Sequence, residues 1–469
     1  MELTKSKRYN SNYLAKIVSI NSFFPHPNEE VTRLKCAKVD GYTIIVGIDE
    51  KEGRFVYFPT SCTINPQLLS YANLYRDASK NADNTKAGMF EDNGRVKAIK
   101  LKGQVSEGFL LPLREFQNFI VDSVNVDISD DKCSEGTEFD EVTHNGKSFW
   151  VNKKYIVETG IQQEENYNKH YNKRQKRLKR ISKIIDNQFR FHIDTVLIRK
   201  CPNAIQPDDL ISITSKWDGT SHISSYVLCH KKLTRKEKIA RFLTKNSFDE
   251  YSHILASRSV IKNMYVYEDG RDDKWMAGGF FGDDRARFLV DEYLKPFMTK
   301  GMTIYGEIVG YNANGKAFSK GYDYGCEMPK AGNEYVYGKH FKLAVYRVTY
   351  TNVDGIVYEF SAKQVQEWCK ANGLLPVVEY YYGYARDLYP DIPEDENWGD
   401  NFIERLANEK KFHMEENSPE CVNKVPHEGI VIRKDSTIGL EVFKLKCFAY
   451  LNREQKALDN GEANIEDLS

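Results

Sequence analysis

Short runs of alternating apolar and polar residues dominate the first part of the chain. Between Tyr13 and Leu113, the runs YLAKIVSI, GYTIIVG, RFVYF and RVKAIKLKG are rich in β-branched and aromatic residues and are bounded by Gly, Pro or Asp. Such runs are typical of β-strands, and several of them in sequence predict a small barrel or sandwich. Asp40-Gly41 separates RLKCAKV from YTIIVG, which predicts a hairpin.

From about Arg114 to Lys200 the pattern loosens into acidic, Asn-rich and then basic sequence. The run NKRQKRLKRISKIIDN (172–187) has Leu178, Ile181 and Ile185 near one helical face. It predicts either a basic amphipathic helix that contacts phosphates or a solvated helical linker.

Strands and helices alternate after Lys200. LISITSK, HISSYVL, MTIYGEIVG, FKLAVYRVTY, GIVIRK and EVFKLKC predict strands. SAKQVQEWCKANG predicts a helix that ends at Gly373, because glycine commonly terminates helices and Pro376 follows it.

Composition is that of an ordinary globular protein: of 469 residues, 41% are hydrophobic and 29% charged. No apolar run reaches the roughly 20 residues of a membrane span, and MELTKSKRYN lacks the apolar stretch of a signal peptide. We therefore expect a cytoplasmic protein that does not associate with membranes. The nine cysteines include no C-x-x-C pair, which favours reduced structural thiols over zinc ligands or disulfides.

Charge is distributed unevenly although the formal net charge is zero. The segment KHYNKRQKRLKRISK (169–183) is strongly basic, whereas the end of the sequence, LDNGEANIEDLS, is acidic. Because a neutral total can hide a local phosphate-binding surface, the charge balance does not exclude a nucleic-acid partner.

The pattern K-x-D-G occurs twice, at Lys38 and at Lys216. It can place a nucleophilic lysine beside a nucleotide, but alone it is a weak signal. Lys38 lies far upstream in the small β-domain. Lys216 is followed in order by Ser257-Arg258-Ser259, Tyr305-Gly306-Glu307, Phe341-Lys-Leu-Ala-Val-Tyr346, Glu428-Gly-Ile-Val-Ile-Arg433 and Lys444-Leu-Lys446. We predict that Lys216 is the nucleophile and that Lys38 is a hairpin residue.

This ordered set resembles motifs I, Ia, III, IIIa, IV and V of the covalent nucleotidyltransferase superfamily, which contains ATP-dependent DNA and RNA ligases and mRNA capping enzymes. KWDGTS, YGEIVG, EGIVIRK…FKLK and the approach FRFHIDTVLIRKCPNAIQPDDLISIT are most similar to phage-type nick-sealing RNA ligases. YLAKIVSI and KLKGQVSEGFLLPL resemble the OB-like domain at the N-terminus of one RNA-ligase branch. About two dozen residues follow Lys446, too few for the further OB domain usual in DNA ligases and capping enzymes.

The resemblance implies an α+β fold in which an N-terminal OB-like β-barrel precedes an ATP-grasp-like ligase/nucleotidyltransferase domain with antiparallel sheets. The expected divisions are an OB-like nucleic-acid-binding domain over 1–115, a linker with a basic helical segment over 116–190, and the nucleotidyltransferase domain over 191–469. Lysines such as Lys97, Lys100 and Lys102 are expected to hold RNA without reading its sequence.

The implied activity is that of an ATP-dependent RNA ligase requiring Mg²⁺ or Mn²⁺. It would seal 5′-phosphate and 3′-OH ends of nicked or broken RNA, in RNA repair, through lysyl-AMP and an adenylylated RNA 5′ end. A monomer is expected. The alternatives are a DNA ligase, a capping guanylyltransferase, or an inactive nucleic-acid-binding relative.

By the same resemblance, Lys216 attacks the α-phosphate. A free lysine is an ammonium at neutral pH, so the positive charges of Lys444, Lys446 and a metal ion would favour its neutral form and stabilise the phosphates. Lys444 and Lys446 are two apart and therefore share one strand face. Asp218 and Gly219 are expected to form the turn that presents the nucleophile.

Three further residues take roles from the resemblance. Glu428 positions the metal, for which a carboxylate is a suitable ligand. Glu307 accepts hydrogen bonds from the ribose, beside Gly306, where a missing side chain allows close backbone approach. Arg258 contacts the nucleotide or the RNA.

Adenine recognition is where the sequence departs from the family. The base is expected to stack on Phe341 or Tyr346, which lie five apart and so face opposite sides of a strand; Phe341 is favoured. The family's motif often ends in Phe-Asp, whereas this chain has Tyr346-Arg347. Thr214 stands where DNA ligases usually place a glutamate, so the choice of ATP over GTP rests on the resemblance.

Overall fold

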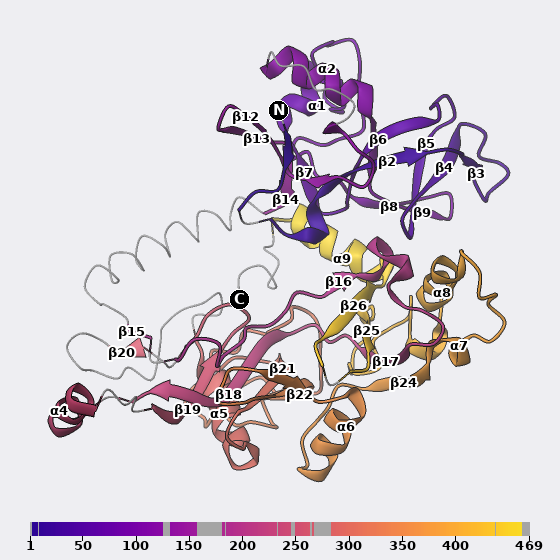
Figure 1. The fold of residues 1–469 in the computed structure, drawn as a ribbon. Helices are drawn as coiled ribbons and strands as arrows, with labels where there is room; N and C mark the ends of the chain where they lie inside the picture. Colours follow the sequence, from indigo (N-terminus) through magenta and orange to yellow (C-terminus); the bar gives the residue numbers. More distant parts are fainter. Residues whose placement is uncertain are drawn as a thin grey trace.

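The structure, a computed structural model, describes residues 2–7, 9–124, 132–156, 181–182, 184–231, 233–244, 249–262, 265–266, 283–436 and 438–461. They form an N-terminal lobe (2–154), at the top of Figure 1, and a C-terminal lobe (184–461) below it. Within these ranges no helix combines the length and apolarity needed to cross a membrane.

Antiparallel strands build the N-terminal lobe. They are β1 (Glu2–Thr4), β2 (Ala15–Ile20), β3 (Phe24–Pro25), β4 (Leu34–Val39), β5 (Tyr42–Gly47), β6 (Gly53–Phe58), β7 (Cys62–Ile64), β8 (Ala98–Leu101), β9 (Gln104–Glu107), β10 (Phe109–Pro112), β11 (Glu138–Phe139), β12 (Glu141–His144), β13 (Lys147–Trp150) and β14 (Asn152–Lys154). Hydrogen bonding orders them as β10-β6-β2-β11, β3-β4-β5, β1-β12-β13, β8-β9 and β14-β7. The predicted strands at 15–20, 42–47, 53–58 and 98–101 are thus confirmed.

Two apolar clusters pack against the β2–β6 strand pair. One seats the β4–β5 hairpin on it through residues such as Val39, Ile44 and Tyr57. The other buries the helices α1 (Pro66–Tyr71) and α2 (Leu113–Val124). Among the described residues no hydrogen-bonded ladder closes these sheets into a barrel. The antiparallel β-structure is confirmed, whereas the OB-like barrel stays a prediction.

The prediction of a linker over 116–190 does not hold for its first part. Phe116 and Phe119 on α2 are fully buried in the N-terminal core, and β11 to β14 pair with β2, β1 and β7. Strands of two to four residues leave almost no alternation to recognise. One signal was available, because Asn145-Gly146, both with positive φ, closes the β12–β13 hairpin.

The predicted basic helix over 172–187 lies largely outside the described residues, as do 157–171. Ile181–Ser182 form a short strand, β15, which pairs antiparallel with β20 (Tyr265–Val266). Ile184 forms a bridge to Cys229. Ile181, placed by its sequence on a helical face, is therefore part of a strand.

Two five-stranded sheets form the C-terminal lobe. The β17 sheet has the order β16-β26-β25-β17-β24, and the β21 sheet has the order β19-β18-β21-β22-β23. All pairs are antiparallel except β16–β26, which confirms an α+β lobe with antiparallel sheets. The strands are β16 (Val196–Leu197), β17 (Leu210–Ser215), β18 (Thr220–His230), β19 (Asp249–Ala256), β21 (Met302–Gly310), β22 (Phe341–Thr351), β23 (Val357–Glu359), β24 (Glu379–Tyr384), β25 (Gly429–Lys434) and β26 (Glu441–Lys446).

Helices cover the outer faces of both sheets. Apolar residues of α5 (Arg285–Leu294) and α6 (Ala362–Ala371) pack on the β21 sheet, and those of α8 (Trp398–Ala407) pack on the β17 sheet. The predicted helix over 361–373 is confirmed: Ser361 caps α6, and Gly373 follows it with φ 63°. The lobe also contains α4 (Arg235–Thr244), α7 (Ala385–Leu388) and α9 (Phe448–Asp459).

The first K-x-D-G copy forms the β4–β5 hairpin, as predicted. Lys38 pairs with Thr43, and Asp40 takes the left-handed conformation with φ 49°. Gly41 donates a hydrogen bond to the carbonyl of Arg199 at 2.7 Å, and a Cβ at Gly41 would lie 3.0 Å from that backbone. The turn therefore docks the N-terminal lobe on the C-terminal lobe, and glycine permits the close approach.

Helix α9 makes a second contact between the lobes. Arg95 donates to the carbonyl of Gln455 at 3.2 Å and to Asp459 at 2.5 Å. Lys97 bonds Asp459 at 3.1 Å and Glu91 at 2.7 Å. Lys97 therefore joins the lobes rather than extending freely toward RNA, whereas Lys100 is exposed on β8 and Lys102 in the turn that follows.

Candidate active site

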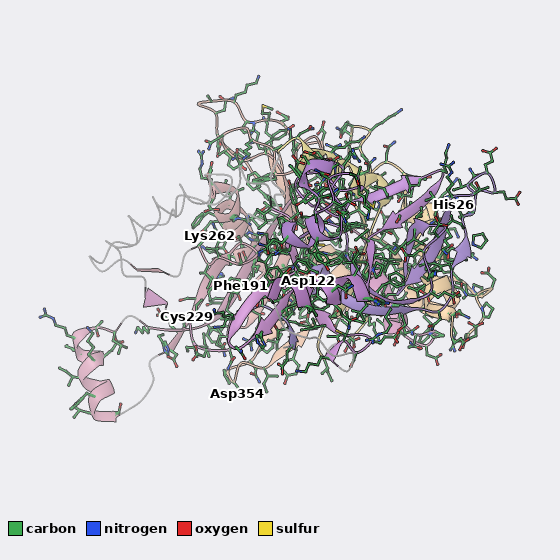
Figure 2. The ribbon with its side chains drawn as sticks, turned by 90° about the horizontal axis from the view of Figure 1, so that it is seen from above. His26, Asp122, Phe191, Cys229, Lys262 and Asp354 are labelled. Carbon is green, nitrogen blue, oxygen red and sulfur yellow. The ribbon has the colours of Figure 1, made fainter. Side chains whose placement is uncertain are left out.

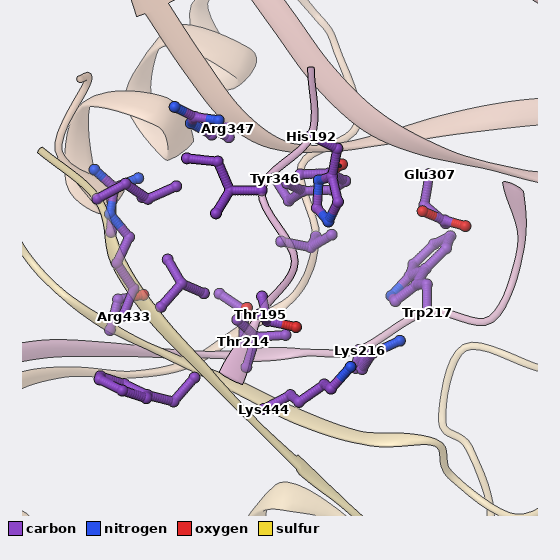
Figure 3. A pocket seen from close by; sticks show the side chains of 18 of the residues that line it. His192, Thr195, Thr214, Lys216, Trp217, Glu307, Tyr346, Arg347, Arg433 and Lys444 are labelled. Carbon is purple, nitrogen blue, oxygen red and sulfur yellow. Dashed lines mark hydrogen bonds between the residues drawn. The ribbon is translucent and has the colours of Figure 1, made fainter. Parts of the chain in front are cut away.

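A cavity of about 360 Å³ lies between the facing surfaces of the two C-terminal sheets (Figure 3). Strand alternation explains its lining. On β17, Ile211 and Ile213 are fully buried in the core beneath α8, whereas Ser212 and Thr214 face the cavity. The segment 192–196 and one face of α6 close its sides.

Lys216 lies where β17 ends. Its backbone N–H donates to the carbonyl of Gly429 at 2.9 Å, which ties it to the start of β25. Its side chain, 14% exposed, forms an ion pair with Glu428, whose side chain is 1% exposed. Because β17 and β25 are neighbours, residues 212 positions apart meet at one end of the cavity.

The turn after Lys216 packs tightly against the β21 sheet. A Cβ at Gly219 would lie 2.4 Å from the carbonyl oxygen of Ile308, so only glycine fits. Asp218 accepts a hydrogen bond from Ser319 Oγ at 2.6 Å. Trp217 stacks on Tyr324 with ring centroids 5.2 Å apart. These contacts orient the turn that carries Lys216.

A buried hydrogen bond connects the residues that precede the ion pair. Ser215 Oγ lies 3.0 Å from His427 Nε2, and both side chains are buried. Burial is the main cause that lowers the pKa of His427 to about 4, so its imidazole is neutral at pH 7. Because Ser215 precedes Lys216 and His427 precedes Glu428, this hydrogen bond holds the two residues of the ion pair side by side.

Lys444 and Lys446 share one face of β26 but meet different surroundings. Lys444 lines the cavity with Lys216 (Figure 3). Lys446 Nζ lies 4.0 Å from Glu428 and 3.4 Å from Glu454 on α9, and it lines a smaller hollow of about 60 Å³ between the lobes. The structure therefore brings Lys444 to the cavity itself and Lys446 to its edge, behind Glu428.

Glu307 comes from β21 and lines the cavity near Lys216 (Figure 3). The preceding Gly306 lies against β22, where a Cβ would be 2.7 Å from the carbonyl oxygen of Ala344. The close backbone approach expected at Gly306 is confirmed.

Tyr346 lines the cavity and lies in a β-bulge. Tyr305 pairs with Arg347 and Gly306 pairs with Val345, which leaves Tyr346 as the extra residue. Its hydroxyl lies 3.0 Å from His192 Nδ1. Burial, followed by the charge of Arg258, lowers the pKa of His192 to about 4, so its imidazole is neutral at pH 7.

The preference for Phe341 over Tyr346 is wrong. Phe341 is 0% exposed and belongs to the core beneath α5 and α6, where it stacks on Tyr335 with centroids 4.6 Å apart. The two aromatics do face opposite sides of β22, as their spacing predicts. The sequence could not show which side faces the cavity.

Arg258 reaches the cavity from the loop after β19 and is held by Asp194. Its Nε donates to Asp194 Oδ1 at 3.1 Å, and both residues line the cavity. Burial tends to raise the pKa of Asp194, but the hydrogen bond and charge of Arg258 more than offset it and the pKa is lowered. The guanidinium is thereby oriented before any ligand arrives.

Several lining residues had no assigned role in the sequence. His192 and Asp194 come from the approach FRFHIDTV, whose likeness to a motif-I run-in was the only signal. Glu379, which accepts a hydrogen bond from Ser212 at 3.0 Å, had none. Arg347, where the family often has Asp, also lines the cavity and bonds Glu359 at 2.9 Å from Nε.

The chain is similar in fold to solved structures of an RNA ligase. A variant of the Naegleria gruberi RNA ligase, with ATP and Mn, superposes with a TM-score of 0.50 at 16% identity, over 94% of this chain and 99% of that chain. This chain has the fold of an RNA ligase. Two other structures of that ligase, an apo variant and one with PPi, give TM-scores of 0.49 and 0.48 at 15% identity, over 96% and 95% of this chain and 100% and 99% of those chains.

No family model matches the chain, and no curated sequence does. The likeness therefore concerns the RNA-ligase fold.

The donor set around Lys216 suits a shared rather than a self-contained metal site. Among the described residues no group of three or more His, Cys, Asp or Glu side chains could hold an ion. Glu428 is one buried carboxylate at the cavity's lysine-rich end. Mg²⁺ is commonly held by one or two carboxylates, substrate phosphates and water, so Glu428 fits such an ion arriving with a nucleotide.

Proposed function

We propose that this protein is an ATP-dependent RNA ligase that joins 5′-phosphate and 3′-OH ends through a lysyl-AMP intermediate on Lys216, in RNA repair. One observation carries the proposal: Lys216 opens onto a cavity whose lining includes Glu307, Tyr346 and Lys444, and it is paired with Glu428. Apart from Tyr346, these residues were selected by motif order alone, and they gather around one cavity in a fold shared with an RNA ligase.

The lining suggests how ATP would lie. The base would stack on Tyr346, held by His192, and the ribose would reach Glu307. The α-phosphate would then lie at the Lys216 end, beside Lys444. We infer this order because Tyr346, Glu307 and Lys216 succeed one another along the wall of the cavity in Figure 3.

The chemistry proceeds in three displacements. Neutral Lys216 Nζ attacks the α-phosphorus, forming an N–P bond while the bond to the β-phosphate breaks and pyrophosphate leaves. An oxygen of the RNA 5′-phosphate then displaces the lysine and takes up AMP. Finally, the 3′-OH attacks that 5′-phosphate and AMP leaves.

Glu428 has a double role in this scheme. As an opposite charge it favours the ammonium form of Lys216, which is unreactive. A Mg²⁺ or Mn²⁺ ion bound by Glu428 and the phosphates would supply charge neutralisation at the phosphates. With its carboxylate so engaged, Glu428 would hold the lysine proton less strongly, and Lys216 can release that proton to solvent.

We further propose that the N-terminal lobe is the counterpart of an OB-like RNA-binding domain. The antiparallel strands β2, β4, β5, β6 and β10 surround one core, which supports this assignment. Lys100 and Lys102 remain its exposed candidates for phosphate contact.

Incubation of the protein with Mg²⁺ or Mn²⁺ and ATP labelled at the α-phosphate tests the function. The expected result is a covalent AMP adduct on a denaturing gel and in the intact mass, followed by sealing of nicked RNA. Labelling from GTP instead would identify a guanylyltransferase, and sealing of DNA alone would identify a DNA ligase. No adduct from either nucleotide would overturn the proposal in favour of a binding protein.

Separate substitutions of the two aromatics on β22, Tyr346 and Phe341, distinguish base stacking from core packing. Tyr346→Ala should weaken ATP binding about tenfold or more, since a base–aromatic stack contributes roughly 1–3 kcal/mol. Phe341→Leu should preserve ATP affinity and lower the free energy of unfolding by about 1 kcal/mol, because it only loosens a buried site. Calorimetric titration with ATP and urea unfolding of both variants provide the measurements. Loss of affinity in Phe341→Leu alone would restore the original assignment.

Removal of the Ser215 hydroxyl should slow the first step without weakening ATP binding. Ser215→Ala leaves His427 Nε2 without its 3.0 Å partner beside the ion pair, and we expect about a fivefold lower single-turnover rate together with about 1 kcal/mol of lost stability. Ser215→Thr should recover the rate.

Ser225→Ala is a matched control, since it removes another buried hydroxyl bond, to Thr303 at 2.5 Å, outside the cavity. It should cost similar stability at an unchanged rate. Equal rates in the Ser215→Ala and Ser225→Ala variants would show that the Ser215 bond only stabilises the fold.

A further inference from the structure

Helix α4 projects from the body of the protein at the outer end of the β18–β19 hairpin (Figures 1 and 2). The two strands of this hairpin run directly from the cavity: β18 starts at Thr220, next to the turn after Lys216, and β19 ends at Ala256, two residues before Arg258. The helix is therefore joined to the candidate active site by one continuous pair of strands.

Nothing in the described part of the chain shields the apolar side chains of α4. Phe242 is 85% exposed, Leu243 74% and Ile239 62%. Thr234 and Glu237 cap the start of the helix, with Glu237 also bonded to Lys231. An isolated helix of ten residues is marginal in water, and most helices are stabilised by packing of an apolar face. The exposed face of α4 thus indicates a surface that another molecule covers.

The charge of this segment indicates what kind of molecule covers α4. KKLTRKEKIARFLT (231–244) contains six Lys or Arg residues and one acidic residue. Ile239, Phe242 and Leu243 have the i, i+3, i+4 spacing of one helical face. Arg235, Lys236 and Lys238 are exposed and lie within or beside that stripe. Cations around an exposed aromatic suit a single nucleic-acid strand, in which phosphates and base faces alternate.

We propose that α4 is an RNA-binding element of this ligase, in which Arg235, Lys236 and Lys238 contact phosphates and Phe242 stacks on a base. The proposal rests on the proposed function for the identity of the polyanion. The eleven residues of β18 span about 35 Å at the usual strand rise, so α4 contacts RNA well away from the joined ends. Its contribution should be absent for RNA too short to cover that distance.

Equilibrium binding of end-labelled RNA to the full chain, followed by fluorescence anisotropy, tests the proposal. The probes are single-stranded RNAs long and short relative to the length of β18. Lys236→Glu/Lys238→Glu should weaken binding of the long RNA about tenfold and reduce the salt slope by roughly 1.4, since each phosphate contact in a single strand contributes about 0.7. Phe242→Ala should weaken it as well, and Phe242→Trp should not.

The control is Lys410→Glu/Lys411→Glu, the same charge change at exposed residues that follow α8, the helix that Figure 1 shows on the opposite side of the molecule from α4. It should leave the RNA affinity unchanged. Unaltered RNA affinity in Lys236→Glu/Lys238→Glu would overturn the proposal. If this variant instead lost binding to anionic vesicles and kept its RNA binding, α4 would be a membrane-surface helix, and the proposal would be overturned as well. AMP labelling of the wild-type protein is measured in parallel, so a failure of the ligase function is seen separately from a failure of α4 to bind RNA.

Discussion

Lys216→Ala should abolish covalent attachment of AMP, whereas Lys38→Ala should leave it at the wild-type level. The alanine variant has no nitrogen at the cavity to form the N–P bond, so labelling should fall at least about 1,000-fold. Lys38 lies in the β4–β5 hairpin and takes no part in the cavity lining. Intact mass after incubation with labelled ATP and Mg²⁺ measures both variants.

A further variant tests whether the first K-x-D-G copy holds the two lobes together. Gly41→Val would push a side chain into the Arg199 backbone, 3.0 Å from the added Cβ, and should loosen the lobes without removing the nucleophile. An adduct that persists in Lys216→Ala, or that disappears in Lys38→Ala, would contradict the assignment of the site.

Glu428→Gln should reduce the rate of AMP attachment by on the order of 100-fold, because it removes the carboxylate that would hold the metal ion, which would in turn neutralise the phosphates. It should also destabilise the protein by about 3 kcal/mol, since Lys216 loses the carboxylate that compensates its largely buried charge. Single-turnover labelling and urea unfolding measure the two effects.

The stability effect has an internal check. In the double variant Lys216→Ala/Glu428→Gln neither charge of the ion pair remains, so its loss of stability should be clearly smaller than the sum of the single losses. Glu404→Gln, an exposed carboxamide substitution on α8, should change neither rate nor stability. Full activity in Glu428→Gln would remove this residue from the chemistry.

Local patterns predicted six strands of the C-terminal lobe (β17, β18, β21, β22, β25 and β26) and the α6 helix, because each has several residues of regular alternation or clear capping. They failed over 138–154, where strands of two to four residues carry too little pattern and are held by partners far away in sequence, such as β1 and β7. The expected division of the chain at 115 failed for a different reason. The sequence assigned Phe116 and Phe119 to the start of a linker, but both are buried on α2 in the N-terminal core, which forms only on folding.

The sequence by itself selected most of the candidate site residues. The order of the motifs selected Lys216, Arg258, Glu307, Glu428 and Lys444, and the two-residue period of strands fixes which neighbours share a face. Only the tertiary structure decided that Tyr346 rather than Phe341 lines the cavity, because alternation places the two on opposite sides of β22 without showing which side faces the β17 sheet. The Ser215–His427 bond and the Asp194 partner of Arg258 likewise arise from segments that meet only on folding, and no local pattern records such contacts.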